Sequence, residues 1–289
     1  MQTHYIWGAP ESSAYPHSFK EFLHHYGVAP NVASNSGKSK VIHYFERYLS
    51  QGGFPGLLNL PQELHLELLQ NYWDTMILKD IIEAHPNENI NITTFHQFCE
   101  SVLARIGRLI SINKIVLELK QIQLRFSVEN IYRYMEYLRE AFLVYTVEIF
   151  SESAAVRTQN PKKVYTVDWA LGYAVSPGTN RHITRAFENM IFLELKRRGY
   201  HISYYKTRQG FEVDFVALMP TDTHPSLIQV CYDIDDFEVR ERELRGIHKS
   251  AKHLQSRENL IITKNHEEII HINDIEVHIR PAWKWLLSS

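Results

Sequence analysis

The sequence contains very little cysteine. Of its 289 residues only Cys99 and Cys231 are cysteines, and they lie far apart in the chain. Neither belongs to a Cys-x-x-Cys pair, and the 16 histidines form no His-Glu-x-x-His motif. The sequence therefore predicts neither a disulfide framework nor a structural zinc site, and it favours a reducing compartment.

The sequence also lacks a secretion signal and a long apolar run. The first residues, MQTHYIWGAPESS, have no basic start and no apolar core, unlike a signal peptide. The longest apolar stretch, residues 141–150, is too short to cross a bilayer and contains Glu148. We expect a cytoplasmic protein with no membrane partner.

No charge of either sign dominates. The formal net charge is -2, and charged residues of both signs make up 22% of the chain. DNA binding cannot be argued from total charge and would require a local basic face. The 44% of hydrophobic residues can bury a real core, and the length favours two domains over one.

A complete phosphate-binding loop is absent. Residues 35–39, Asn-Ser-Gly-Lys-Ser, end like such a loop, but Val32 stands where the loop needs its first glycine. Residues 29–40 are rich in Asn, Ser and Gly, which favours a solvated linker. We therefore expect no ATP site in this chain.

The pattern of residues 57–176 predicts a helical domain that ends in a two-stranded hairpin. Ile131, Met135, Leu138 and Phe142 recur near helical spacing and predict one apolar stripe, and Ser127 is a candidate N-cap. The predicted strands are residues 143–150 and 163–167, joined by the polar stretch 151–161.

Helices followed by a hairpin with a polar tip are typical of a winged helix. The candidate nucleic-acid contacts at this tip are Arg157, Lys162 and Lys163. Between residues 100 and 176 there are ten Lys or Arg against eight Asp or Glu, so the local excess of positive charge is only two.

After a boundary at Pro177-Gly178, the pattern changes to α/β. The expected order is helix 184–198, strands 201–206, 211–218 and 226–232, helix 237–254, strand 259–263 and a short tail. The second helix carries one apolar face that would cover a sheet, formed by Leu244, Ile247, Ala251 and Leu254.

Acidic side chains fall at unusual places in this last domain. Glu188 lies inside the apolar arc of its helix, where an unpaired carboxylate is costly. Glu212 and Asp214 alternate onto one face of a strand, and Gln229 and Cys231 share a face of the next. Glu212 and Asp214 would repel each other, and a magnesium or manganese ion held by Glu188, Asp214 and Gln229 would offset this repulsion. The alternative is that Glu188 and Asp214 merely pair with Arg or Lys side chains.

These residues resemble the PD-(D/E)XK nuclease-like core, which places an acid on a first helix, an aspartate on a second strand, and an acid or Gln followed two residues later by Lys on a third. The phrases FENMIFLELKRRG, YYKT, EVDFVAL, LIQVCYD and REREL resemble the C-terminal domain of a prokaryotic AAA-type ATPase family. YPHSFKEFL, YLSQGGFPGLL, NYWDTMILKDI and NPKKVYTVD resemble, in the right order, the preceding parts of that family.

The resemblance implies three parts, namely the end of an ATPase domain with its linker (1–56), a helical winged-helix-like domain (57–176) and a nuclease-like domain with a central mixed sheet flanked by helices (177–289). It also implies that the nucleotide-binding core is not in this chain.

The chain departs from the nuclease pattern at the lysine. Cys231 stands in its place, and loss of one charge-stabilising donor typically costs about a hundredfold to a thousandfold in rate. Lys206 is a candidate substitute, and Glu212 a candidate second ligand or general base. The resemblance thus implies a weak Mg²⁺ or Mn²⁺ site and degenerate phosphodiesterase chemistry.

Two functions remain open from the sequence. The first is a DNA-associated module with a phosphate-binding wing and a degenerate nuclease-like domain. The second is a non-catalytic module that binds a AAA ATPase domain or another protein partner. The near-neutral charge favours the second, and the predicted carboxylate cluster favours the first.

Overall fold

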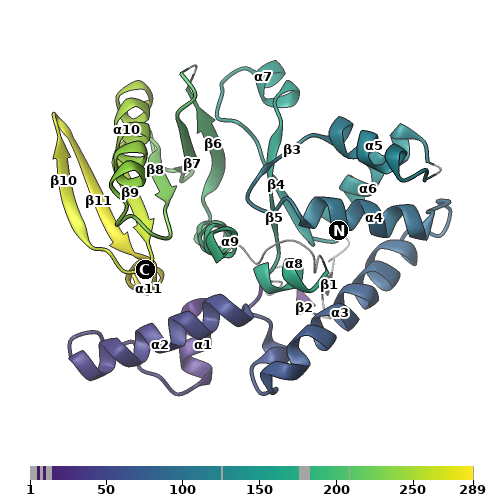
Figure 1. Cartoon of the computed structure of the whole chain (residues 1–289), viewed down its shortest axis with the longest axis horizontal. Helices are drawn as coiled ribbons and strands as arrows, with labels where there is room; N and C mark the ends of the chain where they lie inside the picture. The colour runs from purple at the N-terminus through teal and green to yellow at the C-terminus, as the bar shows by residue number, and fades with distance from the viewer. Residues whose placement is uncertain are drawn as a thin grey trace. The chain divides into compact units, whose positions relative to one another are not determined.

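The structure is a computed structural model that describes residues 5–6, 9–10, 15–124, 126–175, 183–207 and 209–288. The predicted boundary at Pro177-Gly178 lies outside these residues, as does most of the N-terminal segment 1–13. The chain folds into two compact units, whose elements are labelled in Figure 1. The helical unit comprises the described parts of 1–16, 51–146 and 161–182, and the sheet unit those of 17–50, 147–160 and 183–289.

The helical unit packs helices around one apolar core. Its helices are α3 (His65–Met76), α4 (Ile92–Leu103), α5 (Ile112–Gln121), α6 (Val128–Glu140) and α8 (Trp169–Val175). The π-helical turn η4 (Ile77–Ile82) continues α3. Two 3₁₀ turns, η2 (Pro55–Leu57) and η3 (Gln62–Leu64), precede α3. The strands of this unit are short. They are β1 (Tyr5–Ile6), β2 (Ala9–Pro10), β3 (Leu109–Ile110), β5 (Lys162–Thr166) and all but the last residue of β4 (Val144–Val147).

The predicted helical stripe is confirmed for three of its four residues. Phe142 lies beyond the end of α6, has a φ of +56° and is only half-buried. Ile131, Met135 and Leu138 of α6 are all buried in the core of the helical unit. Ser127 caps α6, because its hydroxyl accepts a hydrogen bond from the backbone N–H of Asn130 at 3.2 Å. The chain then turns back into a three-stranded sheet with the order β3-β5-β4.

The polar stretch between β4 and β5 is more structured than a hairpin tip. It contains the helix α7 (Ala154–Gln159), and residues 147–160 belong to the sheet unit. Just before α7 the chain runs beside the edge strand of that unit, where the Phe150 N–H donates to the Tyr204 carbonyl at 2.6 Å. The unpaired edge of the sheet is thereby partly covered.

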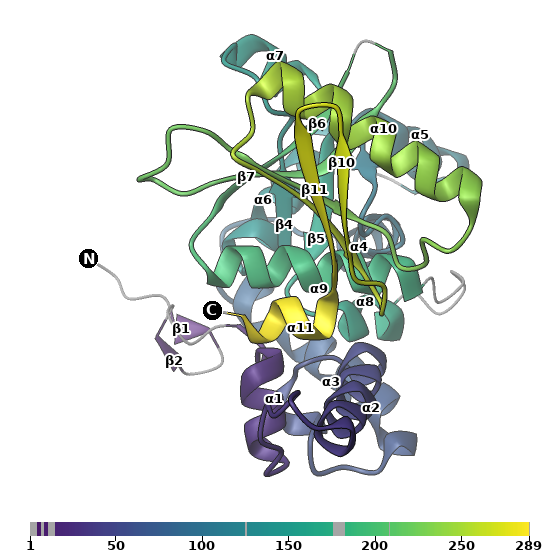
Figure 2. The ribbon, with the colours of Figure 1, turned by 90° about the vertical axis from the view of Figure 1, so that its left-hand side faces the viewer.

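The sheet unit is built on one six-stranded mixed sheet (Figures 1 and 2). Its strands are β6 (His201–Lys206), β7 (Glu212–Leu218), β8 (Ser226–Val230), β9 (Glu258–Thr263), β10 (Glu268–Ile272) and β11 (Ile275–Pro281). Strands β6, β7 and β8 are antiparallel, whereas β8, β9 and β11 are parallel neighbours. The predicted α/β class with a central mixed sheet is confirmed.

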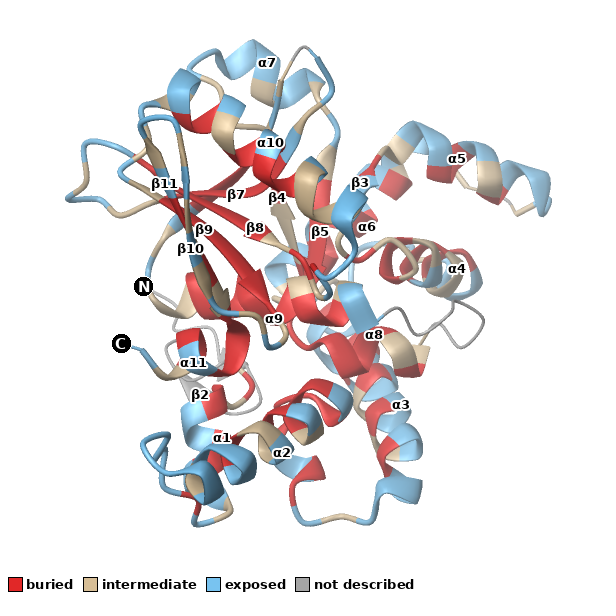
Figure 3. Cartoon of the chain, turned by 60° about the vertical axis from the view of Figure 1, so that its left-hand side comes forward, coloured by how far each residue is buried: buried red, intermediate tan, exposed pale blue. Residues whose placement is uncertain are grey.

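Helices cover this sheet on both faces. They are α9 (Ile183–Arg197), α10 (Phe237–Leu254) and α11 (Ala282–Leu287). The same unit contains α1 (Phe19–His25), which contacts α11, and α2 (Asn35–Gln51). The predicted apolar face of α10 is confirmed, since Leu244, Ile247 and Ala251 pack against strands of the sheet. On the other face, the rings of Phe192 in α9 and Phe215 in β7 are 6.3 Å apart. Figure 3 shows the central strands as buried between these helices.

The prediction of a short tail after residue 263 is wrong. The tail forms β10, β11 and α11, and β11 pairs in parallel with β9. Val277 and Ile279 alternate with polar residues along β11 and are buried beside Ile261 and Ile247. This period-two alternation is the sequence signal that indicates a half-buried strand.

The prediction of a linker across residues 29–40 is also wrong in its second half. Helix α2 begins at Asn35 and includes Gly37, Lys38 and Ser39 in its first turns. The Ser34 hydroxyl accepts the Gly37 N–H at 3.0 Å. A Cβ at residue 37 would lie 2.3 Å from the Asn31 carbonyl oxygen, so close packing explains the glycine.

The described part of the chain contains no helix with both the length and the apolar character needed to cross a membrane.

Candidate functional site

Asp214 and Gln229 meet at the point where the pairing of β7 and β8 ends. Backbone pairing of these strands runs from Ala217 to Phe215, opposite Ser226 to Ile228. Beyond it, the Asp214 N–H donates to Gln229 Oε1 at 3.1 Å. The Val230 N–H donates to Asp214 Oδ2 at 3.0 Å. The two side chains therefore replace the missing ladder bonds, and both are largely buried.

A β-bulge explains why β7 does not follow strict alternation. The pairing of β6 with β7 shifts between Ser203 and Tyr205, which gives β7 one extra residue. As a result, Val213 and Val216 both pack in one cluster with Leu227. Strict alternation would place Val216 on the face of Asp214, but the bulge breaks the alternation and moves Val216 to the face of Val213.

Glu243 of α10 completes the cluster and was missed in the sequence. Gln229 Nε2 donates to Glu243 Oε2 at 2.7 Å, and the Arg242 guanidinium donates to Glu243 Oε1 at 2.5 Å. Burial raises the pKa of the Glu243 carboxyl, the charge of Asp214 adds to this, and the bond from Arg242 opposes it. Residue 243 precedes Ile247 by one helical turn and therefore lies on the buried face of α10. This helical spacing is the sequence signal that indicates a buried glutamate.

Cys231 joins this cluster as a neutral thiol. It is buried, and its Sγ donates to the Asp233 carbonyl at 3.0 Å. Burial and the neighbouring Glu243 charge raise the pKa of Cys231 to about 12. At neutral pH the thiol therefore carries no charge and cannot supply the positive charge that a lysine would supply at this position.

The structure places Glu212 and Lys206 away from the buried cluster. Lys206 Nζ donates to Glu212 Oε1 at 2.6 Å, and these side chains are 44% and 41% exposed. The expected second ligand or base and the candidate substitute lysine are thus paired with each other at the surface.

Glu188 is half-buried on α9, the helix that packs on the opposite face of the sheet from α10. Its neighbour Asn189 is completely buried. Among the described residues, no three His, Cys, Asp or Glu side chains lie close enough together to hold a metal ion. The polar cluster that the structure does form consists of Asp214, Gln229, Cys231 and Glu243.

The three predicted wing residues are not equally accessible. Arg157 lies 3.7 Å from Glu148 and donates to the carbonyls of Ser151 and Glu152 at 2.6 and 3.0 Å. Lys163 is only 5% exposed, because it sits on β5, the middle strand of the three-stranded sheet. Lys162 is half-buried. As placed, Lys163 is not available to a phosphate.

The surface of α5 and α6 combines paired cations with exposed apolar side chains. Arg133 donates to Glu88 at 2.5 Å, and Arg139 pairs with Glu136 at 2.8 Å. Exposed apolar residues on or beside these helices are Leu117 (60%), Ile122 (54%), Tyr132 (49%) and Val128 (36%). Such a surface suits a protein better than a phosphate backbone.

Comparison with known proteins finds two domain families of unknown function. Residues 42–182 match the domain of unknown function DUF8612, and residues 184–284 match the domain of unknown function DUF4143. The second domain is typically found in AAA-ATPase-associated proteins.

Two curated relatives cover nearly the whole chain. An uncharacterized protein of Methanocaldococcus jannaschii is 33% identical over 286 residues, and one of Haemophilus influenzae is 28% identical over 275 residues. Each match covers 94% of this chain but only 62% and 64% of the respective relative, so the chain spans less than two thirds of the length of either.

Proposed function

We propose that this chain is a non-catalytic assembly module of a AAA-ATPase-associated protein. In this proposal the helical unit is a winged-helix-like module that contacts protein, and the sheet unit is a nuclease-like domain that has lost phosphodiester hydrolysis. The observation that carries the proposal is the state of the buried cluster. Asp214, Gln229 and Glu243 are engaged in internal hydrogen bonds, and Cys231 is a neutral thiol.

The order of elements supports both parts of this description. In the sheet unit the order is α9-β6-β7-β8-α10-β9, with three antiparallel strands followed by a parallel one, as in a PD-(D/E)XK core. In the helical unit the order is α4-β3-α5-α6-β4-β5 with the sheet order β3-β5-β4, as in a winged helix.

The donor set fits a catalytic magnesium ion poorly. Magnesium requires near-octahedral oxygen ligands at about 2.0–2.1 Å, usually with carboxylates and water. Here one oxygen of Asp214 accepts a backbone N–H, and the Gln229 carbonyl accepts another. Arg242 already neutralises Glu243, and the exposed Glu212 is paired with Lys206. We therefore propose at most weak Mg²⁺ or Mn²⁺ binding, without a reaction step.

A nuclease assay tests the loss of catalysis. Labelled duplex and branched DNA are incubated with the protein and either Mg²⁺ or Mn²⁺. We expect no cleavage above background, and measurable Mn²⁺-dependent cleavage only after Cys231→Lys combined with Gln229→Glu restores a cation and a carboxylate. Robust cleavage by the natural sequence that is lost in Asp214→Ala but retained in Glu212→Ala would overturn the proposal.

DNA binding is the second candidate function, favoured by the winged-helix-like order of elements. Against it stand the ion-paired arginines of α6 and the burial of Lys163. Titration of labelled duplex at several salt concentrations separates the two, because each phosphate contact contributes to the slope of log affinity against log salt.

A further inference from the structure

The second half of α10 and the turn after it carry a local positive charge. Residues 244–257 contain no aspartate or glutamate, whereas the acids of the helix, Glu238, Glu241 and Glu243, lie in its first half. The cations of this segment are Arg245, Lys249, Lys252 and Arg257. The near-neutral charge of the whole chain therefore conceals a basic region, and a local basic face is what contact with a polyanion requires.

Three of these cations share the exposed side of the helix. Arg245, Lys249 and Lys252 are all exposed, and their spacing of four and three residues places them on one side of an α-helix. Neighbouring Cβ atoms at this spacing are about 5–6 Å apart. We call these three side chains the basic face of α10. Arg257 does not belong to it, because its guanidinium is paired with Asp222 at 2.9 Å.

No carboxylate among the described residues neutralises the basic face. Lys249 Nζ donates to the amide oxygen of Gln209 at 2.8 Å and lies 4.3 Å from the centre of the Phe211 ring. Arg245 Nε donates to the backbone carbonyl of Glu241 at 3.3 Å. These neutral contacts orient two of the three side chains and leave their positive charge available to a partner.

The helix that carries the basic face is fixed on the sheet unit (Figure 2). A Cβ at residue 246 would lie 3.2 Å from the Glu212 carbonyl oxygen, so Gly246 lets α10 approach the β6–β7 hairpin closely. Farther along the helix, the rings of His253 and Tyr205 stack with their centroids 6.0 Å apart. Because its inner side is buried on the sheet, α10 cannot enter a groove of DNA. Its exposed cations can reach phosphates but not base edges.

The composition of this surface suits phosphates better than protein. Among the described residues between 240 and 257, no large hydrophobic side chain is exposed. The surface of α5 and α6, in contrast, combines ion-paired arginines with exposed apolar residues. Duplex DNA carries one negative charge per about 1.7 Å of its axis, so a row of three cations can meet several phosphates at once.

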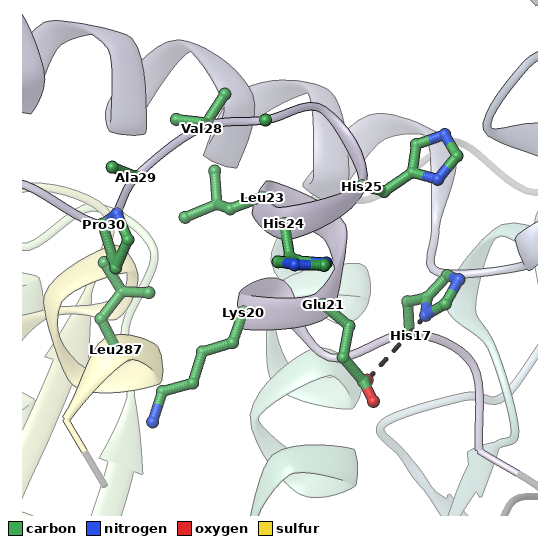
Figure 4. Close-up of a pocket in the computed structure, with 11 residues that line it drawn as sticks. His17, Lys20, Glu21, Leu23, His24, His25, Val28, Ala29, Pro30 and Leu287 are labelled. Carbon is green, nitrogen blue, oxygen red and sulfur yellow. Dashed lines mark ion pairs between the residues drawn. The ribbon is translucent and has the colours of Figure 1, made fainter.

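The pocket beside α1 in the same unit offers no comparable charge (Figure 4). Its volume is about 670 Å³, and its walls include the apolar side chains of Leu23 and Leu287. Lys20 at its border is matched by Glu21, and burial lowers the pKa of His17, so this ring is neutral near pH 7. The basic face of α10 is therefore the better candidate for an anionic partner.

We propose that the basic face of α10 binds the phosphate backbone of duplex DNA without reading its sequence. The contact is electrostatic. The three cations displace counterions from neighbouring phosphates, so the affinity falls as the salt concentration rises. This inference goes beyond the proposed function, because it adds a nucleic-acid contact to the sheet unit and requires neither hydrolysis nor the β4–β5 connection. The nuclease assay and the test of the basic face can therefore fail independently of each other.

Fluorescence anisotropy with a labelled duplex, measured on the full chain at several salt concentrations, tests the basic face. Each phosphate contact contributes about 0.9 to the slope of log affinity against log salt. Lys249→Gln combined with Lys252→Gln should therefore reduce the magnitude of this slope by nearly two. The same variant should weaken binding by roughly tenfold to a hundredfold at about 50 mM salt. Lys249→Arg combined with Lys252→Arg keeps both charges and should bind like the natural sequence.

A matched control removes two lysines from another helix. Lys114 and Lys120 are exposed on α5, so Lys114→Gln combined with Lys120→Gln lowers the net charge by the same amount. This control should change the slope by less than about one. Unchanged thermal unfolding of both double variants excludes misfolding as the cause of any loss.

Three results would overturn the proposal. The natural sequence does not bind the duplex at low salt, the glutamine variant of Lys249 and Lys252 keeps its slope, or the control loses as much of the slope as that variant. Equally tight binding of polyglutamate with the same number of charges would overturn it as well, because the basic face would then accept an acidic protein chain.

Discussion

Each unit buries an aspartate, and the two aspartates have different surroundings. In the helical unit, Asp168 is completely buried and accepts the N–H groups of Gly53 and Ala170, each at 2.7 Å. In the sheet unit, Asp214 sits beside a glutamine, a thiol and a second carboxylate. Burial of an acid therefore does not by itself indicate an active site, because the backbone N–H groups around Asp168 suit a structural role.

Asp168 also joins two segments that lie far apart in the sequence. The turn Gly52-Gly53-Phe54-Pro55-Gly56 and the strand that precedes Asp168 are over a hundred residues apart. The carboxylate joins them by holding the Gly53 N–H while it caps the first turn of α8. We infer that Asp168 fixes the turn by which the chain enters the helical unit.

The largest expected effect is the pH dependence that Asp168 gives to stability. Burial raises the pKa of Asp168 to about 7, although its backbone hydrogen bonds oppose the shift. Its ordinary value is 3.8, so between about pH 4 and pH 7 the folded state binds more protons than the unfolded state. The free energy of unfolding contributed by this group therefore falls as pH rises, by up to roughly 4 kcal/mol.

Urea unfolding of the natural sequence and of Asp168→Asn across this pH range measures the effect. Asparagine does not titrate, so the natural sequence should lose stability relative to this variant as the pH rises from 4 to 7. Two parallel curves would contradict the assignment, because they would show that Asp168 keeps an ordinary pKa in the folded protein.

The next effect tests the contact between Asp168 and the glycine turn. Gly52 has a φ of +81°, and a Cβ there would lie 2.3 Å from Asp168 Oδ1. Gly199 has the same φ of +81°, but nothing lies within 4 Å of a Cβ there. Gly199→Ala should cost about 1–2 kcal/mol for the backbone alone, and Gly52→Ala about 2 kcal/mol more for the clash. Thermal unfolding measures both losses of stability. Equal losses for the two variants would mean that the turn accommodates a Cβ at residue 52 without disturbing Asp168.

Local patterns predicted the regular elements well. The predicted ranges 201–206 and 237–254 match β6 and α10, and the apolar face of α10 indicated that this helix covers a sheet. The start of α2 was missed because Asn35, Ser36 and Gly37 are typical of loops, whereas the Ser34 cap and the packing of Gly37 favour a helix. Tertiary context overrides weak local preference here.

The candidate site was only half predictable. Asp214, Gln229 and Cys231 follow from adjacent strands, so alternation places them near one another. Glu243 comes from α10, and its helical spacing from Ile247 indicates a buried position but does not indicate that it faces Gln229. The surface pairing of Glu212 with Lys206 depends on the hairpin register, which the sequence does not specify in the presence of a bulge.

A smaller effect separates a structural role of Asp214 from a metal role. Asp214→Ala leaves the Val230 N–H without its side-chain acceptor and should destabilise the protein by about 1–3 kcal/mol in the absence of any metal. Glu212→Ala removes a surface pair and should cost only about 0–1 kcal/mol. Thermal unfolding with and without Mn²⁺ measures both. A large Mn²⁺ shift in the natural sequence that disappears in Asp214→Ala would restore the metal interpretation.

The smallest expected effect concerns the cations around the β4–β5 connection. Arg157 is already engaged with Glu148 and two carbonyl oxygens, and Lys162 is half-buried. If DNA binding at this connection is only incidental, the double variant Arg157→Ala/Lys162→Ala should change the slope of log affinity against log salt by less than about one. The control variant Lys20→Ala, on the exposed surface of α1, should change this slope by as much. Lys163 is left unchanged, because substitution of a buried residue would confuse binding with stability. Fluorescence anisotropy with a labelled duplex gives both slopes. A decrease of nearly two in the double variant alone would show that both side chains contact phosphates, and the helical unit would then be a DNA-binding module after all.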